Sequence, residues 1–329
     1  MKSSQPTMKD VAQEAGVALG TVSKVFNGIP VGDSYRTKVE DAAKKLGYQV
    51  NQYARGLRAG STFTVALILP GVNHPFFASL AQHVCEALAA RGYRMLLYVT
   101  ASNPESEQAC VNMVRQNKAD GIIGLTYNPL VVDEDLPFVG IDRSFRHDIP
   151  CVSSDNYSGG RMAAEKLIEL GCGHLAFLRT GSARPGEADK RGDGFESACR
   201  ARNVPYEALR LNDGEDWELF REFFRSHIHN GRLDIDGIFC STDLVAWRIR
   251  HMLRELGFRV PEDVQIIGYD GIRRFGGEAL YCSTIVQPIQ KIAETAVDLL
   301  LTKDRSNIPA LVCLPVSYVP GGTTREEVQ

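Results

Sequence analysis

The 329-residue chain contains eight cysteines, but none of them are paired at the spacing of a metal site. Each stands alone, mostly among apolar neighbours, and the sequence has no Cys-x-x-Cys. Neither zinc-finger spacing nor a disulfide framework is therefore indicated. We expect reduced thiols, no bound metal and a cytoplasmic setting.

Long uncharged hydrophobic runs are also missing. The first seven residues are polar and lack the apolar centre of an export signal, and no later run is long enough to span a bilayer. We therefore expect neither export, as an exported sugar-binding protein would require, nor a membrane partner. The last residues contain no leucine heptads, which favours a homodimer over a coiled-coil tetramer.

Common catalytic motifs are absent as well. The sequence has no Gly-x-Ser-x-Gly elbow, no Gly-x-x-x-x-Gly-Lys phosphate loop and no His-Glu-x-x-His pair. We predict no catalytic residue and no cofactor. An α/β enzyme is the alternative from another class, because such folds host many chemistries. Turnover of a sugar would favour the enzyme, and binding without turnover would oppose it.

Charge is distributed unevenly along the chain. Residues 1–60 hold nine Lys and Arg against five Asp and Glu, whereas the rest holds 28 against 35. A basic segment on an acidic body suits a nucleic-acid partner for that segment alone, although a solvated charged face would look the same. Hydrophobic residues make up 44% of the chain, which at this length allows two or three compact units.

Three short helices are predicted in residues 1–50, which we assign as a helix-turn-helix head. Thr7 and Asp10 have the spacing of a capping box at a helix start. Gly16-Val17 supplies a turn before a second helix from about Ala18 to Phe26. A third helix, from about Asp33 to Leu46, would close a small core.

The second helix carries the side chains that we expect to read DNA. Val22, Val25 and Phe26 can pack inward, which turns the opposite face outward. Polar groups on that face can contact base edges or phosphates, and a leucine can touch a thymine methyl. A helix pair of this size also occurs in proteins that never meet DNA. The residues assigned to DNA reading are Leu19, Gly20, Thr21, Ser23, Lys24 and Asn27.

Residues 51–61 are predicted to form a hinge helix and a linker. Asn51 can cap a short helix, and the apolar Leu57 can enter a minor-groove step. Because so short a helix is marginal alone, we expect it to be ordered when paired with a second copy on DNA. The alternative is a linker with a chance leucine. The DNA-contacting residues assigned here are Asn51, Ala54, Arg55 and Leu57.

From residue 62 to 329 short apolar runs alternate with amphipathic stretches. Such runs between helices predict parallel sheets covered on both faces, a three-layer αβα arrangement. Because this alternation of apolar and amphipathic stretches begins again near residue 158, we predict two lobes. The first is formed by about 62–157 with 287–317, and the second by about 158–286 with 318–329. The expected strands are Val65–Leu69, Met95–Val99, Gly121–Leu125, His174–Leu178, Gly237–Cys240 and Gln265–Gly268.

Polar and aromatic residues follow several of these strands. Ligands collect beyond the carboxyl ends of parallel strands, and carboxylates with aromatic rings suit a polyhydroxylated ligand. Asp and Asn at loop starts more often cap helices, so only their recurrence favours a site. We expect the stretch from Thr180 to Gly186 to form a loop above the cleft. The strand-end groups are Asn73–Phe77, Asp142-Arg143, Asp155-Asn156, Ser241–Asp243 and Tyr269-Asp270.

The head resembles that of the lactose-repressor family of bacterial transcription regulators. The shared patterns are Thr-x-x-Asp-Val-Ala-x-x-Ala-Gly-Val from Thr7, Thr-Val-Ser-x-Val-x-Asn from Thr21 and Asn-x-x-Ala-Arg-x-Leu from Asn51. The chain departs from the family at Ala18, where Ser usually caps the recognition helix, and at Gln49-Val50, where Arg-Pro often precedes the hinge.

The resemblance extends over the body. It rests on Asn73–Phe77, Val152–Gly160, Arg191–Phe195, Ile267–Gly271 and Thr284–Pro288, and two of these runs, Val152–Gly160 and Ile267–Gly271, look most like the sucrose and ribose operon repressors.

The resemblance also implies roles for individual residues. Leu57 would be the hinge leucine at the operator centre, and Leu19, Gly20 and Lys24 would hold the main reading positions. The body would be a periplasmic-binding-protein-like effector domain, with ligand contacts from Asp142, Arg191, Thr242 and Asp270. The full set assigned to effector binding is His74, Phe76, Asp142, Arg143, Asp155, Arg191, Trp217, Phe239, Thr242 and Asp270.

Head and body together predict a sequence-specific DNA-binding transcriptional regulator and not an enzyme. We expect a nucleoid-associated homodimer on near-palindromic double-stranded operator DNA, since paired half-sites mirror two-fold symmetry. A sugar or sugar phosphate would close the lobes and release a repressor of carbohydrate-utilisation genes. The same two domains also allow the opposite response, in which another small polar ligand acts as a corepressor and strengthens operator binding.

Overall fold

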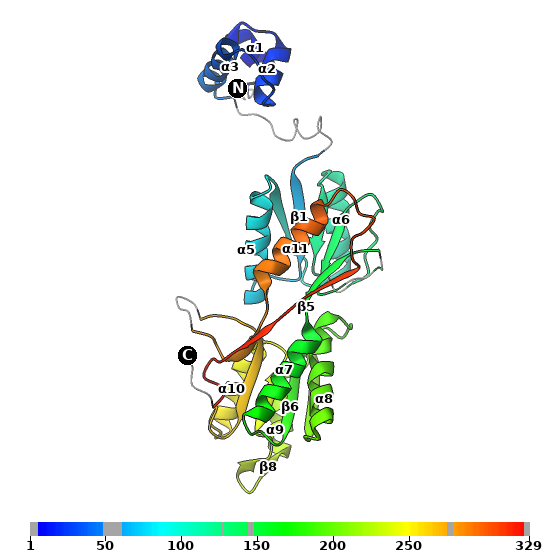
Figure 1. Ribbon diagram of the computed structural model, residues 1–329, viewed down its shortest axis with the longest axis vertical. Helices are drawn as coiled ribbons and strands as arrows, with labels where there is room; N and C mark the ends of the chain where they lie inside the picture. The colour runs from blue at the N-terminus through cyan, green and yellow to red at the C-terminus, as the bar shows by residue number, and fades with distance from the viewer. Residues whose placement is uncertain are drawn as a thin grey trace. The chain divides into compact units, whose positions relative to one another are not determined.

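The computed structural model describes residues 6–48, 61–126, 128–143, 146, 148–274 and 279–325. The chain divides into two compact units, Met1–Thr62 and Phe63–Gln329, each with its own hydrophobic core (Figure 1). No helix within these described ranges is long and apolar enough to cross a membrane. The predicted hinge residues Asn51, Ala54, Arg55 and Leu57, together with Gln49-Val50, lie outside the described residues.

The first unit is a three-helix head, as the sequence predicts. Its helices are α1 (Met8–Ala15), α2 (Leu19–Phe26) and α3 (Asp33–Leu46). The capping box at Thr7 is confirmed: the Thr7 hydroxyl accepts from the Asp10 N–H, and the Asp10 carboxylate accepts from the Thr7 N–H. Gly16 ends α1 at φ 64°, a left-handed conformation that costs glycine little. One buried valine from each helix, Val11, Val22 and Val39, meets in the core.

The second unit has two lobes, and the first is built on a six-stranded parallel sheet in the order β13-β5-β4-β3-β1-β2. Side chains of β1 alternate between two cores. Val65, Leu67 and Leu69 pack under α5 and α11, whereas Ala66 and Ile68 pack under α6. The elements are β1 (Thr64–Leu69), α5 (Pro75–Ala89), β2 (Arg94–Val99), α6 (Pro104–Gln116), β3 (Gly121–Gly124), β4 (Phe138–Ile141), β5 (Cys151–Ser154), α11 (Ile289–Leu301) and β13 (Leu311–Leu314).

The second lobe repeats this plan around a sheet in the order β14-β12-β11-β10-β6-β7. Helices α7 and α8 cover one face of the sheet, and α9 and α10 cover the other. The elements are α7 (Asn156–Glu169), β6 (Leu175–Gly181), the 3-10 turn η1 (Glu187–Asp189), α8 (Lys190–Arg202), β7 (Tyr206–Asn212), α9 (Glu218–Ser226), the hairpin β8 (Ile228–His229) and β9 (Arg232–Leu233), β10 (Gly237–Cys240), α10 (Asp243–Glu255), β11 (Gln265–Asp270), β12 (Ser283–Val286) and β14 (Ser317–Val319).

The prediction of parallel sheets needs one correction. Strand β14 runs antiparallel to β12 at the edge of the second sheet. The chain leaves β13 at the carboxyl edge of the first sheet and reaches β14 after only residues 315 and 316. Strand β14 therefore starts at the lobe boundary and runs away from it, whereas β12 runs toward it. The chain also passes between the lobes after β5 and after β12, which places Asp155 and Gln287 at the lobe boundary.

Helices α7 and α8 approach each other through glycines. A Cβ on Gly160 would lie 1.8 Å from the Arg191 carbonyl oxygen, and one on Gly194 would lie 2.0 Å from the Tyr157 carbonyl oxygen. No larger side chain fits at either position without moving a helix. This close contact fixes the start of α8, and with it the position of Arg191, against the lobe boundary.

Candidate functional site

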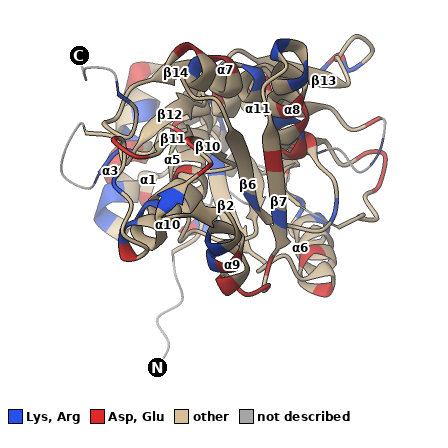
Figure 2. Cartoon of the chain, turned by 90° about the horizontal axis from the view of Figure 1, so that it is seen from below, with Lys and Arg blue, Asp and Glu red and all other residues tan. Residues whose placement is uncertain are grey.

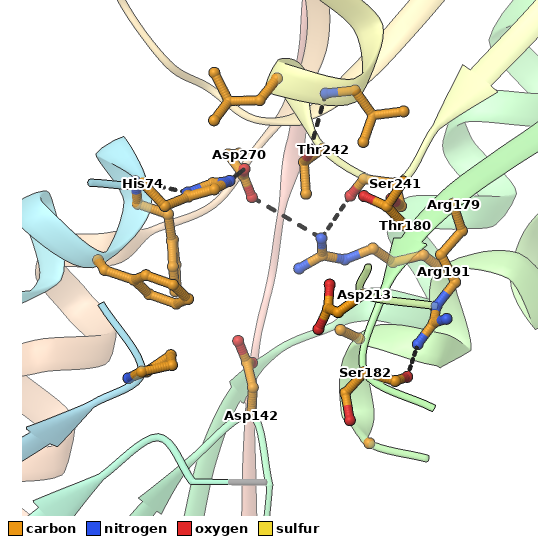
Figure 3. Close-up of a pocket in the computed structure, with 18 of the residues that line it drawn as sticks. His74, Asp142, Arg179, Thr180, Ser182, Arg191, Asp213, Ser241, Thr242 and Asp270 are labelled. Atoms are coloured by element: carbon orange, nitrogen blue, oxygen red, sulfur yellow. Dashed lines mark hydrogen bonds and ion pairs between the residues drawn. The ribbon is translucent and has the colours of Figure 1, made fainter. Parts of the chain in front are cut away.

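A cavity of about 540 Å³ lies between the two lobes at the carboxyl ends of their strands (Figure 3). Its lining from the first lobe includes His74, which follows β1, and Asp142, which follows β4. Arg191, at the start of α8, and Asp270, at the end of β11, enter from the second lobe. In both sheets, polar residues that follow strands therefore line the cavity, as the sequence predicts.

Arg191 is the centre of the polar network in this cavity. The side chain is buried, its Nε donates to Asn156 Oδ1 at 2.7 Å, and its Nη1 donates to the Ser241 carbonyl at 2.7 Å. Nη1 also lies 3.9 Å from Asp270 Oδ1, and the guanidinium carbon lies 3.7 Å from the centre of the Tyr269 ring. In Figure 3 the other terminal nitrogen of Arg191 faces the middle of the cavity.

The network continues from Arg191 into the first lobe. Asn156 Nδ2 donates to Ser153 Oγ at 3.0 Å, and Ser153 Oγ donates to an Asp142 carboxylate oxygen at 2.8 Å. Burial raises the pKa of Asp142, and the charge of Arg191 opposes that rise. A chain of hydrogen bonds thus connects polar groups of both lobes beneath the cavity.

Asp270 faces the cavity from the second lobe under backbone strain. Its φ is 124°, a region that residues with a side chain rarely adopt. Its Oδ1 accepts from Gln287 Nε2 at 2.7 Å, and its Oδ2 is buried without a hydrogen-bond partner among the described residues. Burial raises the pKa of Asp270 well above its usual value, against the opposing charge of Arg191. An unpaired buried oxygen and a strained backbone at one residue are typical of a functional position.

His74 has a structural and a site-facing nitrogen. Its Nδ1 accepts from the Phe76 N–H at 3.3 Å and so caps helix α5. Burial, and then the charge of Arg191, lowers the pKa of His74 from 6.5 to about 4. The ring is therefore neutral near pH 7, and because Nδ1 accepts, its proton resides on Nε2. That N–H is a donor directed at the cleft.

The outer part of the cavity is lined by aromatic and charged groups. Trp217 and Arg248 stack, with the guanidinium carbon 3.8 Å from the ring centre. Arg179 Nη2 lies 2.7 Å from Asp189 Oδ1 and donates to the Ser182 carbonyl at 2.7 Å. The stretch from Thr180 to Gly186, predicted as a mobile loop, contributes lining residues, but Thr180 and Gly181 form the end of strand β6 and only the residues after them are a loop.

Most effector residues assigned from the sequence line this one cavity. They are His74, Phe76, Asp142, Arg143, Arg191, Trp217, Thr242 and Asp270. Sequence reasoning did not assign Arg179, Ser241, Arg248 and Gln287 to the site. Ser241 and Gln287 lie in the motifs described above, and Arg179 directly follows the predicted strand His174–Leu178, a signal that could have found it. Nothing in its local sequence distinguishes Arg248 from a surface arginine.

Two assignments need correction, because Asp155 and Phe239 do not contribute to the lining. Asp155 Oδ1 accepts from the Ser158 N–H at 3.0 Å and caps α7, the common role of such a residue. Phe239 is fully buried and lies against Phe177 and Phe195 under α7 and α8. It faces the core because side chains alternate along β10, and only the residues after Cys240 reach the cavity.

In the head, α2 presents the face predicted for reading DNA. Leu19 is 44% exposed, and Gly20, Lys24 and Asn27 are also exposed. Thr21 and Ser23 are half-buried, and Asn27 Nδ2 donates to Ser23 Oγ at 3.2 Å. Ala18 stands at the N-cap of α2 and has no side-chain oxygen to cap it. Basic residues of α3, Lys44 and Lys45 among them, add positive charge to the head (Figure 2).

A helix-turn-helix head joined to a two-lobed domain with a cleft defines a class of transcription regulators that carry their own ligand domain. Comparison with known proteins identifies the family. A model described as bacterial regulatory proteins, lacI family, matches residues 7–51, and one described as periplasmic binding protein-like domain matches residues 164–324.

Relatives of known function match almost the whole chain. The sucrose operon repressor of Streptococcus mutans serotype c is 33% identical over 319 residues, which cover 95% of this chain and 98% of that protein. The ribose operon repressor of Bacillus subtilis is 32% identical over 332 residues, covering 98% and 99%. The chain belongs to the lacI family of bacterial regulatory proteins, and it is a DNA-binding transcriptional repressor and not an enzyme.

Solved structures agree with this assignment. A periplasmic binding protein/LacI transcriptional regulator from Alkaliphilus metalliredigens, complexed with D-xylulofuranose, is 28% identical with a TM-score of 0.68, covering 80% of this chain and 99% of that one. The Lac repressor dimer bound to operator and an anti-inducer has a TM-score of 0.83 over 98% of this chain and 99% of that one. At 22% identity, this second likeness concerns the fold alone. The predicted fold class is confirmed.

Proposed function

We propose that this repressor binds a sugar in the cleft and thereby controls carbohydrate-utilisation genes. The observation that carries the proposal is the network around Arg191, in which Asp270 lies 3.9 Å from the guanidinium and Asp142, from the other lobe, is connected to it through Ser153 and Asn156. Such a set of donors and acceptors next to aromatic rings suits a hydroxyl-rich ligand. Relatives named as sucrose and ribose operon repressors, and a structural relative complexed with D-xylulofuranose, support the same ligand class.

The cleft suits ligand control because its polar residues belong to both lobes. A ligand that contacts Asp142 in one lobe and Asp270 in the other binds best when the lobes are close together. Such a ligand shifts the protein toward a closed state by its differential affinity for the two states. If the closed state holds the heads differently, effector and operator binding are coupled, and each changes the affinity of the other by the same factor.

For the DNA side, we infer that α2 enters the major groove. Leu19, Gly20, Thr21, Ser23, Lys24 and Asn27 are the residues proposed to contact bases and phosphates. Asn51, Ala54, Arg55 and Leu57 are proposed to act in the hinge, with Leu57 in the minor groove. A homodimer, supported by the dimeric Lac repressor relative, would place two heads on a near-palindromic operator within the nucleoid.

A thermal-shift screen of sugars, sugar phosphates and purines tests the effector proposal. A ligand that binds only the folded state raises the unfolding temperature as its concentration increases. We expect at least one sugar to stabilise the body, and R191K to abolish the shift, because the single nitrogen of lysine cannot reproduce the planar fork that donates to Asn156 from Nε and to Ser241 from Nη1. Stabilisation by a purine and by no sugar would contradict the proposal.

A further inference from the structure

A further carboxylate, Asp243, is fully buried in the second lobe and does not line the cavity. It is the first residue of α10, and the groups that hydrogen-bond to it are uncharged. Burial raises the pKa of Asp243 to about 6, and the hydrogen bonds that it accepts oppose that rise. A buried carboxylate is costly unless donors satisfy its oxygens, so the donors around Asp243 indicate its role.

The hydrogen bonds of Asp243 converge on the peptide groups that follow Asp270. Its Oδ2 accepts from the Ile272 N–H at 2.6 Å, and its Oδ1 accepts from the Thr284 hydroxyl at 2.6 Å. Thr284 Oγ1 in turn accepts from the Gly271 N–H at 3.3 Å. Both residues after Asp270 are therefore held by Asp243, one directly and the other through Thr284.

The segment that these bonds hold has an unusual backbone. Asp270 has a φ of 124°, and Gly271 follows with a φ of 82°. A residue with a side chain keeps such a conformation only where the surrounding structure holds it. A relaxed Asp270 would have a negative φ, and its side chain would point in another direction. The bonds from Asp243 and Thr284 thus keep the Asp270 carboxylate facing the cavity (Figure 3).

Strand β11 leaves space for the Asp243 carboxylate. A Cβ on Gly268 would lie 2.3 Å from Asp243 Oδ1 and 2.7 Å from Cys282 Sγ. The Cys282 thiol donates to the same carboxylate oxygen, with Sγ 3.3 Å from it. A larger residue at position 268 would therefore displace the carboxylate from the segment that it holds.

We propose that Asp243 and Thr284 are positioning residues for effector binding, which do not contact the ligand but hold Asp270 in the conformation that directs its carboxylate into the cavity. The inference rests on the proposed function, in which the ligand is a sugar, and it assigns a role in binding to residues outside the cavity lining. Loss of either side chain should release the segment after β11, so that Asp270 relaxes and the effector binds more weakly.

A matched pair of threonines separates positioning from stability. T284V removes the bridging hydroxyl, and T284S keeps it. T323V is the control, because Thr323 is equally buried in the same lobe, accepts from the Ser283 N–H at 2.8 Å and donates to the Ile266 carbonyl at 2.6 Å. T284V and T323V should lower the urea midpoint of unfolding by similar amounts, since each leaves a buried backbone group without its partner.

Calorimetric titration of the full-length variants with sucrose, D-ribose, D-fructose and D-glucose measures their effect on binding. For each of these sugars that binds the parent, we expect T284V to bind at least about tenfold more weakly, T284S within about threefold and T323V within about twofold. Equal affinity losses in T284V and T323V would show that Thr284 acts through stability alone, and would overturn the inference while leaving the proposed function intact.

Crystal structures of the unliganded variants test the positioning role without any ligand. In T284V we expect the φ of Asp270 to become negative and its bond to Gln287 to break, whereas T323V should keep both. D243A should resemble T284V. D243N should resemble the parent, because its oxygen can accept from Ile272 and its nitrogen can donate to Thr284.

An Asp270 that keeps its φ of 124° in T284V overturns the inference, whether or not D243A folds. If no sugar of the panel binds the parent, the proposed function is wrong. The conformation of Asp270 in T284V and T323V still confirms or overturns the positioning role in that case.

Discussion

His74 Nε2 and Asp270 Oδ2 lie 4.0 Å apart across the cleft, one side chain from each lobe (Figure 3). The histidine nitrogen carries a proton, and the carboxylate oxygen has no hydrogen-bond partner among the described residues. The gap is about 1 Å longer than an N–H···O hydrogen bond. A small closing movement of the lobes would join this pair, so a ligand that holds the lobes together would also gain this bond.

Two substitutions of His74 separate the roles of its two ring nitrogens. H74N keeps an acceptor at the N-cap of α5 but is too short to reach Asp270, whereas H74A loses both functions. We expect H74N to unfold at pH 7 within about 0.5 kcal/mol of the parent, and H74A to lose about 1 kcal/mol. Both should bind the effector about tenfold more weakly. Chemical unfolding and calorimetric titration measure these effects, and parental effector affinity in H74N would argue against the cross-lobe bond.

Protonation of His74 makes the free energy of unfolding depend on pH. The folded-state pKa of His74 is depressed from 6.5 to about 4, so the unfolded chain binds a proton more readily. The neutral His74 ring therefore contributes its full share to the free energy of unfolding above pH 6.5, and this contribution is lost as the pH falls toward 4. Between pH 7 and pH 4 the parent should therefore lose up to about 3 kcal/mol relative to H74N. Unfolding free energies of both proteins across this range test this, and parallel curves would contradict it. The opposite contribution of Asp243, whose pKa is raised to about 6, is common to both proteins and cancels in the comparison.

The third prediction concerns the start of the recognition helix. A18S adds a side-chain oxygen at the N-cap of α2, where none exists, and T7A removes the one that caps α1. We expect A18S to stabilise the head by about 1 kcal/mol and T7A to destabilise it by a similar amount. Hydrogen exchange of the α1 and α2 amides in the full-length protein would report slower exchange in A18S and faster exchange in T7A. No change in α2 exchange in A18S would contradict the uncapped start.

The fourth prediction tests the contact between α7 and α8. G160A places a methyl group against the Arg191 carbonyl, so α8 must shift. We expect a loss of about 2–3 kcal/mol in the free energy of unfolding and weaker effector binding, because Arg191 moves with the helix. The neighbouring R161A, which removes only an exposed pair with Glu165, should cost less than about 0.5 kcal/mol. Equal stability of the two variants would refute the argument.

Apolar strands and capped helices could be predicted from the sequence, including the four-residue β3 and β10, but several other strands could not. The four-residue β4 and β5 have no flanking pattern of their own, and β7 carries Glu207 and Arg210 because it lies at the edge of its sheet. Strand β14 could not be assigned from local sequence, because its antiparallel pairing depends on where β13 ends.

The residues of the site also differ in whether the sequence could predict them. The strand-end rule located Asp142, Thr242 and Asp270, because it depends only on where strands stop. The same rule could have found Arg179, which directly follows the predicted strand His174–Leu178, but not Arg248, whose approach to the cleft depends on tertiary packing. Phe239 was assigned to the ligand although strand alternation directs it into the core.

Operator binding measured with and without the stabilising sugar tests most directly whether the cleft controls the DNA-binding head. Genomic DNA fragments retained by the full-length protein would be sequenced, and the shared fragment titrated by fluorescence anisotropy at fixed salt. We predict a near-palindromic site that is bound in the absence of sugar and released when the stabilising sugar is added. Tighter operator binding in the presence of the sugar would mean that the sugar is a corepressor and not an inducer. An operator affinity that no cleft-binding sugar changes would contradict control of the head by the cleft.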